Sequence, residues 1–226
     1  MLIIFDCDGV LIDSEIVSAQ VDCEFLRELG YDAAPEELAH RFAGFTTERI
    51  FELVGEELDR AVPDEIIRRA ERETDRRLGQ TVEPIPGVHD MLNVLDHPRC
   101  ICSNSRPERL RVSLTKAGLW ERFRPYIFSA REVPGGRGKP APDVFLHASR
   151  VLDANPSEAI VLEDSVAGVT GAVAAGMRAV GFTGGSHTWP GHAEALMEAG
   201  AMTVVRRLED VPATVEALGQ WRPEAI

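Results

Sequence analysis

Short apolar runs alternate along the chain with longer stretches in which apolar residues recur at the spacing of a helix face. The short runs predict buried strands at residues 2–5, 100–102, 160–162, 179–182 and 203–205. Helices are predicted where Val144, Ala148 and Val151 share one face, and again from Val166 to Gly176. Alternating strands and helices form parallel sheets with right-handed crossovers, so we expect a doubly wound α/β core.

One long stretch lacks this alternation. Residues 15–82 show helical patterns only, such as the apolar stripe of Ile67, Ala70, Thr74 and Leu78. We therefore expect an all-α cap domain at residues 15–82, inserted into an α/β catalytic core formed by residues 1–14 and 83–226. The segment 83–87, Glu-Pro-Ile-Pro-Gly, is typical of a hinge that returns the chain to the core.

Polar side chains follow three of the predicted strands. In an open parallel sheet, ligands bind beyond the carboxyl ends of the strands, so side chains at these positions can meet in one site. They are Asp6 and Asp8 after the first run, Ser103, Asn104 and Ser105 after the second, and Glu163 and Asp164 after the third. Clustered carboxylates repel one another unless a cation lies between them, and oxygen ligands suit Mg²⁺. The pattern therefore indicates a magnesium site.

Lys139 is one of only two lysines in the chain, and it lies in a glycine-rich loop just before a predicted helix. A compact ammonium beside a helix start suits a phosphate oxyanion. Each motif alone also has an ordinary structural explanation as a turn, a helix cap or a solvated charge. Their occurrence together, each at a strand end, favours a phosphate-processing site.

Composition narrows the choice of partners. The 226 residues carry 24 basic and 37 acidic side chains, a net charge of −13, which argues against nucleic-acid and anionic-membrane partners. The four cysteines form no metal-binding or disulfide pattern, and no targeting segment is visible. We expect a cytoplasmic protein, a monomer, that acts on a small-molecule phosphate ester.

The segment 5–15, Phe-Asp-Cys-Asp-Gly-Val-Leu-Ile-Asp-Ser-Glu, resembles the first motif of the haloacid dehalogenase superfamily. Ser103 is similar to its second motif, Lys139-Pro140 to its third, and the segment 162–165, Leu-Glu-Asp-Ser, to its fourth. The resemblance spans the chain and is greatest to the group that holds β-phosphoglucomutases and sugar-phosphate phosphatases, within it to 6-phosphogluconate phosphatases. It implies a Rossmann-like core with a helical cap.

The resemblance also implies a role for each motif residue. Asp6 would be the nucleophile that forms an aspartyl-phosphate, and Asp8 the acid and base that serves the leaving group and then the water. Three residues would hold the transferring phosphoryl group: Ser103, Asn104 and Lys139. Mg²⁺ would be bound by Asp6, the backbone carbonyl of Asp8 and Asp164, with Glu163 as a further ligand or as a partner of one.

Single sequence features argue against several other classes of enzyme within this superfamily. Asp8 argues against a true dehalogenase, the lysine-free cap against a phosphonatase, and the absence of Lys-Thr-Gly-Thr after Asp6 against a P-type ATPase. A phosphosugar mutase stays open as an alternative. It is disfavoured by Ser18, where the mutases carry histidine, and by the absence of lysine from the loop 42–49. A phospho-acceptor receiver domain is a more distant alternative, because receivers lack the helical insert.

The cap loop should face the mouth of the site. Arg49 is therefore a candidate for binding a second anionic group of the substrate, and Thr46 and Thr47 are candidates for further contacts. An ion pair between Arg49 and Glu48 or Glu52 on a solvated helix face is the competing interpretation. The sequence does not fix the substrate.

Overall fold

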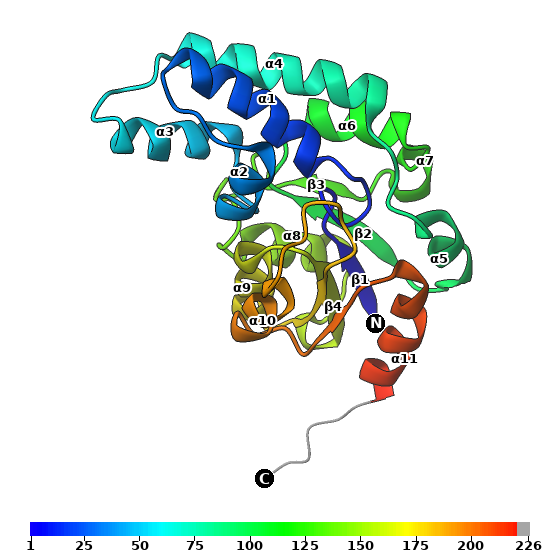
Figure 1. The fold of residues 1–226 in the computed structure, drawn as a ribbon. Helices are drawn as coiled ribbons and strands as arrows, with labels where there is room; N and C mark the ends of the chain where they lie inside the picture. Colours follow the sequence, from blue (N-terminus) through cyan, green and yellow to red (C-terminus); the bar gives the residue numbers. More distant parts are fainter. Residues whose placement is uncertain (221–226) are drawn as a thin grey trace.

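A computed structural model of the protein describes residues 1–220 and shows one parallel sheet with helices on both faces and a helical layer above its carboxyl edge (Figure 1). The strands are β1 (Leu2–Phe5), β2 (Arg99–Ser103), β3 (Ile127–Ser129), β4 (Ala159–Glu163), β5 (Arg178–Phe182) and β6 (Thr203–Val205). Their order in the sheet is β3-β2-β1-β4-β5-β6, and every pairing is parallel. The predicted α/β fold is confirmed.

The sequence prediction missed β3. This strand is three residues long, only Ser129 in it is fully buried, and it lies at the edge of the sheet beside β2. Its apolar run is only Ile127 and Phe128, followed by Ser129, whereas the equally short edge strand β6 consists entirely of β-branched residues, which favour strands, and was predicted.

Alternate residues of the central strands point to opposite faces and enter two separate cores. Ile3 and Phe5 pack on one side with α5 (Val88–Val94), α6 (Pro107–Lys116) and α11 (Val211–Gln220). Leu2 and Ile4 pack on the other with α8 (Asp143–Val151), α9 (Val166–Ala174) and α10 (His192–Glu198). The short helix α7 (Trp120–Phe123) precedes β3. Because both faces are covered, the carboxyl edge of the sheet is where polar side chains collect.

Residues 15–82 contain four helices and no strand: α1 (Glu15–Glu28), α2 (Pro35–Arg41), α3 (Thr47–Glu57) and α4 (Asp64–Thr81). They share a core of their own, in which Leu26, Phe51, Val54 and Ala70 are completely buried. Pro35 opens α2 and Pro63 is the cap residue of α4, each followed by acidic residues in the first turn, where they offset the helix dipole. We call this helical layer the cap.

Two chain segments join the cap to the rest, and they pair with each other. The amide of Asp13 donates to the carbonyl of Glu83 at 2.9 Å, and the amide of Ile85 donates to the carbonyl of Leu11 at 3.0 Å. Ile12 and Pro84 form an antiparallel bridge between these bonds. The outgoing and returning segments therefore leave the core side by side. Across residues 1–220, every helix is too short or too polar to cross a bilayer.

Candidate active site

The carboxyl ends of three adjacent strands bring the polar residues together. β1 lies between β2 and β4, so Asp6 follows the central strand, while Ser103 and Glu163 end its two neighbours. The amide of Asp6 donates to the carbonyl of Leu162 at 2.9 Å, which extends the β1–β4 ladder by one residue. The expected convergence at one edge of the sheet is present.

Lys139 lies at the centre of this cluster. Its Nζ is 2.5 Å from Oδ1 of Asp6 and 2.5 Å from Oε1 of Glu163, and its side chain is only 3% exposed. The same ammonium lies 5.2 Å from the centre of the Phe145 ring. Burial lowers the pKa of Lys139, but the two carboxylates outweigh it and hold the pKa above its ordinary value. A fixed positive charge therefore sits beside Asp6.

Three carboxyls offer oxygen atoms within 4.8 Å of one another, those of Asp6, Glu163 and Asp164. Burial raises the pKa of Asp6 well above its usual range; Lys139 opposes this, and the carboxyls of Glu163, Asp164 and Asp8 add to it. Buried oxygen donors that repel one another are the donor set that a hard divalent cation stabilises, so these residues fit a metal ion.

Glu163 differs from the other two carboxyls, because the protein itself occupies both of its oxygens. Oε1 pairs with Lys139, and Oε2 accepts from the backbone amide of Ser165 at 3.0 Å and from its hydroxyl at 3.1 Å. Asp6 and Asp164 are thus better placed than Glu163 for direct contact with a cation. Glu163 holds Lys139 in position.

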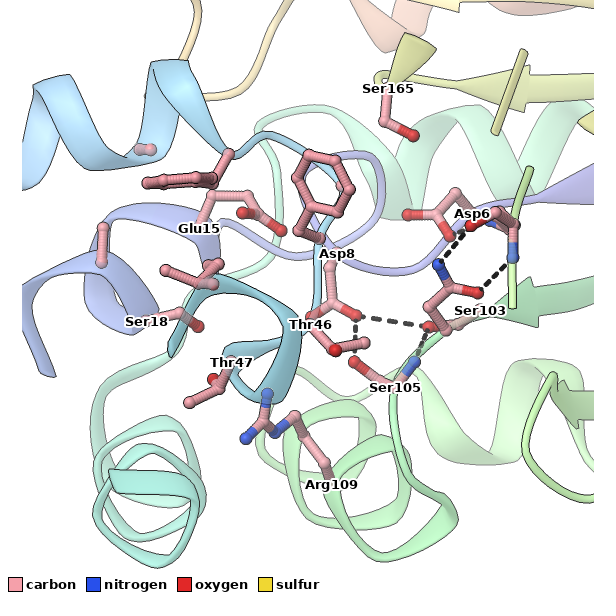
Figure 2. Close-up of a pocket in the computed structure, with 18 of the residues that line it drawn as sticks. Asp6, Asp8, Glu15, Ser18, Thr46, Thr47, Ser103, Ser105, Arg109 and Ser165 are labelled. Atoms are coloured by element: carbon pink, nitrogen blue, oxygen red, sulfur yellow. Dashed lines mark hydrogen bonds and ion pairs between the residues drawn. The ribbon is translucent and has the colours of Figure 1, made fainter. Parts of the chain in front are cut away.

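Asp8 stands on a tight turn after β1, in which the amides of Leu11 and Ile12 both donate to the carbonyl of Cys7. Its Oδ1 accepts from the hydroxyl of Ser14 at 2.7 Å. Its Oδ2 accepts from the hydroxyl of Ser105 at 2.7 Å, as Figure 2 shows. Two hydroxyl donors on opposite oxygens fix the orientation of the carboxyl plane. The side chain of Asp8 lies outside the three-carboxyl cluster.

Gly9 is required by this turn. Its φ is +75°, a conformation that other residues rarely adopt, and a Cβ at this position would lie 1.9 Å from Oδ2 of Asp164. The absence of a side chain lets the turn approach the carboxyl cluster.

Ser103 and Asn104 lie beside the cluster and make different hydrogen bonds. The hydroxyl of Ser103 accepts from the amide of Ser105 at 2.9 Å and is 3.4 Å from Oδ2 of Asp8. Asn104 accepts from the amide of Lys139 at 2.8 Å through Oδ1. Asn104 therefore holds the Lys139 loop against β2, and the site brings together all the motif residues expected from the sequence.

Comparison with known proteins places this arrangement in a family. The model for haloacid dehalogenase-like hydrolases matches residues 3–182. The chain belongs to the haloacid dehalogenase-like hydrolase family. A 6-phosphogluconate phosphatase from Escherichia coli is 29% identical over 192 residues, which are 83% of this chain and 85% of that protein.

Two solved structures share the whole architecture of this haloacid dehalogenase-like hydrolase. A haloacid dehalogenase-like protein of unknown function from Agrobacterium tumefaciens is 47% identical, with a TM-score of 0.88 over 97% of this chain and 99% of that one. A family hydrolase from Deinococcus radiodurans with bound phosphate and sodium is 32% identical, with a TM-score of 0.78 over 98% and 97% of the two chains.

The loop between β5 and α10 contacts Asp164, although no role was expected for it from the sequence. Nε2 of His187 is 2.9 Å from Oδ2 of Asp164, and Nε2 of His192 is 2.6 Å from its backbone oxygen. Burial lowers the pKa of His187, but Asp164, Glu15 and Asp13 outweigh it and raise the pKa to about 9. His187 lies 23 residues beyond Asp164 in the sequence, so no local pattern predicts this contact.

A cleft separates the cluster from the cap, and Figure 2 shows cap and core side chains facing each other across it. The cap contributes the carboxyls of Glu15, Asp22 and Glu71 and no basic side chain to its lining. The basic side chains of this lining come from the core, and they are Arg106, Arg109, Arg131 and Lys139. Burial raises the pKa of Glu15 to about 8. Apart from Lys139, these cleft residues carry no local sequence signal, since their neighbours are distant along the chain.

The three cap residues chosen from the sequence lie in different places. Thr46 and Thr47 line the cleft, where Thr46 caps α3 by accepting from the amide of Arg49. Arg49 lines an adjoining groove that shares Thr46, Asn104 and Lys139 with the cleft, and its guanidinium pairs with Glu52 at 2.9 Å with its side chain 46% exposed. Its proposed contact with substrate stays a prediction, and the competing ion pair is present.

Proposed function

We propose that the protein is a magnesium-dependent phosphatase that hydrolyses a small phosphorylated sugar or sugar acid through an aspartyl-phosphate on Asp6. The main observation in support of this proposal is that Asp6 contacts Lys139 within a cluster of carboxyls. On the neighbouring turn, Asp8 is held by hydrogen bonds from Ser14 and Ser105. The membership of the hydrolase family and the phosphate bound in the Deinococcus radiodurans relative support this proposal.

In this mechanism an oxygen of Asp6 attacks phosphorus and the bond to the leaving oxygen breaks. Lys139 offsets the charge on the phosphoryl oxygens, and its buried pairing with Glu163 keeps its ammonium in place. Ser103 is positioned to donate its hydroxyl to a phosphoryl oxygen. Asn104 acts mainly by fixing the backbone of Lys139.

Asp8 supplies the proton that the leaving alkoxide needs, and then removes a proton from the water that hydrolyses the aspartyl-phosphate. Its hydrogen bonds to Ser14 and Ser105 hold the carboxyl in one orientation for both steps. A bound Mg²⁺ would neutralise charge on the phosphoryl group and on Asp6. Asp6 and Asp164 are the side chains we assign to it, with the carbonyl of Asp8.

The substrate class rests on the relatives and on the cleft. The Escherichia coli relative is a 6-phosphogluconate phosphatase, and a 27% identical Thermotoga maritima protein is a phosphorylated carbohydrates phosphatase. The cap side of the cleft contributes three carboxyls and no basic side chain to the lining, which disfavours a second phosphoryl group on that side. We therefore propose hydrolysis of a monophosphate rather than a mutase reaction.

The remaining assignments follow from the same proposal. We propose residues 1–14 and 83–226 as the catalytic core and residues 15–82 as the cap domain, because the hydrophobic cores largely follow this division. The four cysteines are buried and unpaired, which supports the cytoplasm as the compartment. We propose that the enzyme works as a monomer.

The test measures phosphate release with and without Mg²⁺ from sugar phosphates, sugar-acid phosphates and p-nitrophenyl phosphate. We expect steady turnover that EDTA abolishes and added Mg²⁺ restores. Asp6→Asn should lower kcat at least 1,000-fold because the nucleophile is lost, and Asp8→Asn at least 100-fold because the acid is lost.

Other outcomes would point elsewhere. Interconversion of sugar phosphate isomers without net phosphate release would mean a mutase. A single phosphorylation of Asp6 without turnover would mean a phospho-acceptor domain. Full activity of Asp6→Asn would remove the aspartyl-phosphate mechanism.

A further inference from the structure

Asp22 and Arg109 are side chains of the cleft lining that lack hydrogen-bond partners for some of their polar atoms. Asp22 on cap helix α1 is 1% exposed, and its Oδ1 is buried without a hydrogen bond. Arg109 on core helix α6 has a side chain that is 13% exposed, and its Nη2 is likewise buried without a partner. A buried polar atom without a partner costs about 1–3 kcal/mol, so such atoms call for explanation.

The two side chains line the same cleft as Asp6 and Asp8, Asp22 from cap helix α1 and Arg109 from core helix α6. Figure 2 shows the guanidinium of Arg109 pointing from α6 toward Thr47 at the start of α3. Thr47 in turn donates its hydroxyl to Oδ2 of Asp22 at 3.5 Å, a weak contact that leaves the carboxyl short of donors. The cleft thus holds an unmatched acceptor on Asp22 and an unmatched donor on Arg109, and Nε of Arg106 is a second unmatched donor in its lining.

The guanidinium of Arg109 is held in place by a carboxylate of the cap. Nε of Arg109 donates to Oδ1 of Asp75 on cap helix α4 at 2.7 Å, which fixes the guanidinium while leaving Nη2 free. Arg106 pairs with the other oxygen of Asp75 at 2.6 Å. A guanidinium that is positioned through one nitrogen keeps its terminal nitrogens available for a planar acceptor such as a carboxylate.

From this arrangement we propose that Asp22 and Arg109 determine substrate specificity, with Asp22 accepting from a hydroxyl of the leaving group and Arg109 donating to its carboxylate. The substrate class is then a phosphate ester of a polyhydroxylated carboxylic acid. This inference rests on the proposed phosphatase function and assigns the anion contact to Arg109 rather than to Arg49. Arg49 already has Glu52 as a partner outside this cleft.

A carboxylate fits this wall better than a second phosphate. Asp22 and Glu71 also line the cleft, and Asp75 is shared by both arginines, so the region offers little net positive charge. A singly charged carboxylate can pair with Arg109 there, whereas a dianion would face the neighbouring acids at close range. The hydroxyl contact of Asp22 adds selectivity, because a substrate without that hydroxyl leaves the buried carboxyl unpaired.

The test compares two open-chain substrates that differ at one carbon. 6-Phosphogluconate ends in a carboxylate, and glucitol 6-phosphate ends in a hydroxymethyl group. We expect Arg109→Gln to lower the ratio of kcat/KM for 6-phosphogluconate to that for glucitol 6-phosphate at least tenfold, mainly through KM. Asp22→Asn should raise KM for both polyol substrates at least fivefold, and change KM for p-nitrophenyl phosphate less.

Two further variants separate specificity from structure. Arg49→Ala should leave the substrate ratio within twofold of the wild-type value. Asp75→Asn disturbs the ion pair that fixes the Arg109 guanidinium without removing it, so it should lower the same substrate ratio, but less than Arg109→Gln does. The melting temperature of each variant reports folding.

The inference is overturned if Arg109→Gln changes both polyol substrates equally, or if the ratio falls with Arg49→Ala and not with Arg109→Gln. It is also overturned if Asp22→Asn changes KM for p-nitrophenyl phosphate as much as for the polyols. Failure of the proposed phosphatase function looks different, because the wild-type protein would then release phosphate from none of the substrates, p-nitrophenyl phosphate included.

Discussion

Charge at this site is controlled by burial as much as by neighbouring ions. Lys139 is the buried cation beside Asp6, and it is shared with Glu163. Asp22 lies on the other side of the cleft, where burial raises its pKa to about 7 while Arg109 and Thr47 lower it only partly. An acid with such a pKa changes its charge near neutral pH, so Asp22 should affect stability in this range.

The pH dependence of Asp22 has a definite sign. Its pKa in the folded protein is above its ordinary value of 3.8, so the folded state binds the proton more tightly than the unfolded state. Its contribution to stability is complete below about pH 4 and is lost as pH rises through about 7. Asp22→Asn should therefore raise the free energy of unfolding relative to wild type more at pH 8 than at pH 4, by at most about 4 kcal/mol.

Urea denaturation of both proteins at pH 4, 6 and 8 measures this difference. A variant whose stability relative to wild type is the same at all three values would show that Asp22 does not titrate in this range.

At the scale of single elements, the loop 183–191 contacts both the carboxyl cluster and the cap. Its His187 contacts the carboxyl of Asp164. The ring of Trp189 stacks on that of His192, with 3.8 Å between ring centres, and its centre lies 4.5 Å from the ring centre of His40 in the cap. The loop therefore links a proposed metal ligand to cap helix α2. Residues that orient a ligand without touching the metal usually change its affinity when removed.

We expect His187→Ala to weaken Mg²⁺ binding about tenfold, because Asp164 would lose the donor that orients it. Isothermal titration of Mg²⁺ into the enzyme measures the affinity directly, and the Mg²⁺ dependence of kcat gives a second value. His89→Ala on α5 is the matched control, since His89 lies outside the cleft lining. Equal affinities in the two variants would remove this role from His187.

At the scale of the whole molecule, ion pairs hold the cap against the core. Asp75 of α4 accepts from Arg106 and from Arg109 of α6, and all three side chains are mostly buried. The cap loop also touches the core directly, because a Cβ at Gly44 would lie 2.7 Å from that of Ser165. The structure thus has its cleft covered by the cap.

Asp75→Asn should destabilise the fold by about 1–3 kcal/mol, because two mostly buried guanidinium groups lose a charged partner. It should also raise KM for every phosphate ester, since the cap would cover the cleft less of the time. Thermal unfolding and steady-state kinetics measure the two effects. Asp64→Asn at the exposed start of α4 is the control, and a similar loss of stability there would contradict the role of Asp75.

The sequence predicted those parts that depend on local patterns. Apolar runs located the central strands, and the residue after each run located Asp6, Ser103 and Glu163, because strand ends in a parallel sheet meet by construction. It could not predict β3, whose apolar run is only Ile127 and Phe128, nor the contacts of Asp22, Arg109 and His187. Those contacts, Asp22 with Thr47, Arg109 with Asp75 and His187 with Asp164, join residues 23 to 34 positions apart, and only the packed tertiary structure brings them together.

The paired segments 11–13 and 83–85 have a consequence for how such proteins can change over time. Because the ends of the insert leave the core as hydrogen-bonded neighbours, closing that junction places little strain on the sheet, whatever the length of chain between its ends. Substrate choice could then be altered by exchanging the insert as a module while the catalytic edge of the sheet is inherited unchanged. A chimera that carries a cap from another family member between residues 13 and 83 would retain Asp6, the proposed nucleophile, and acquire a different recognition surface.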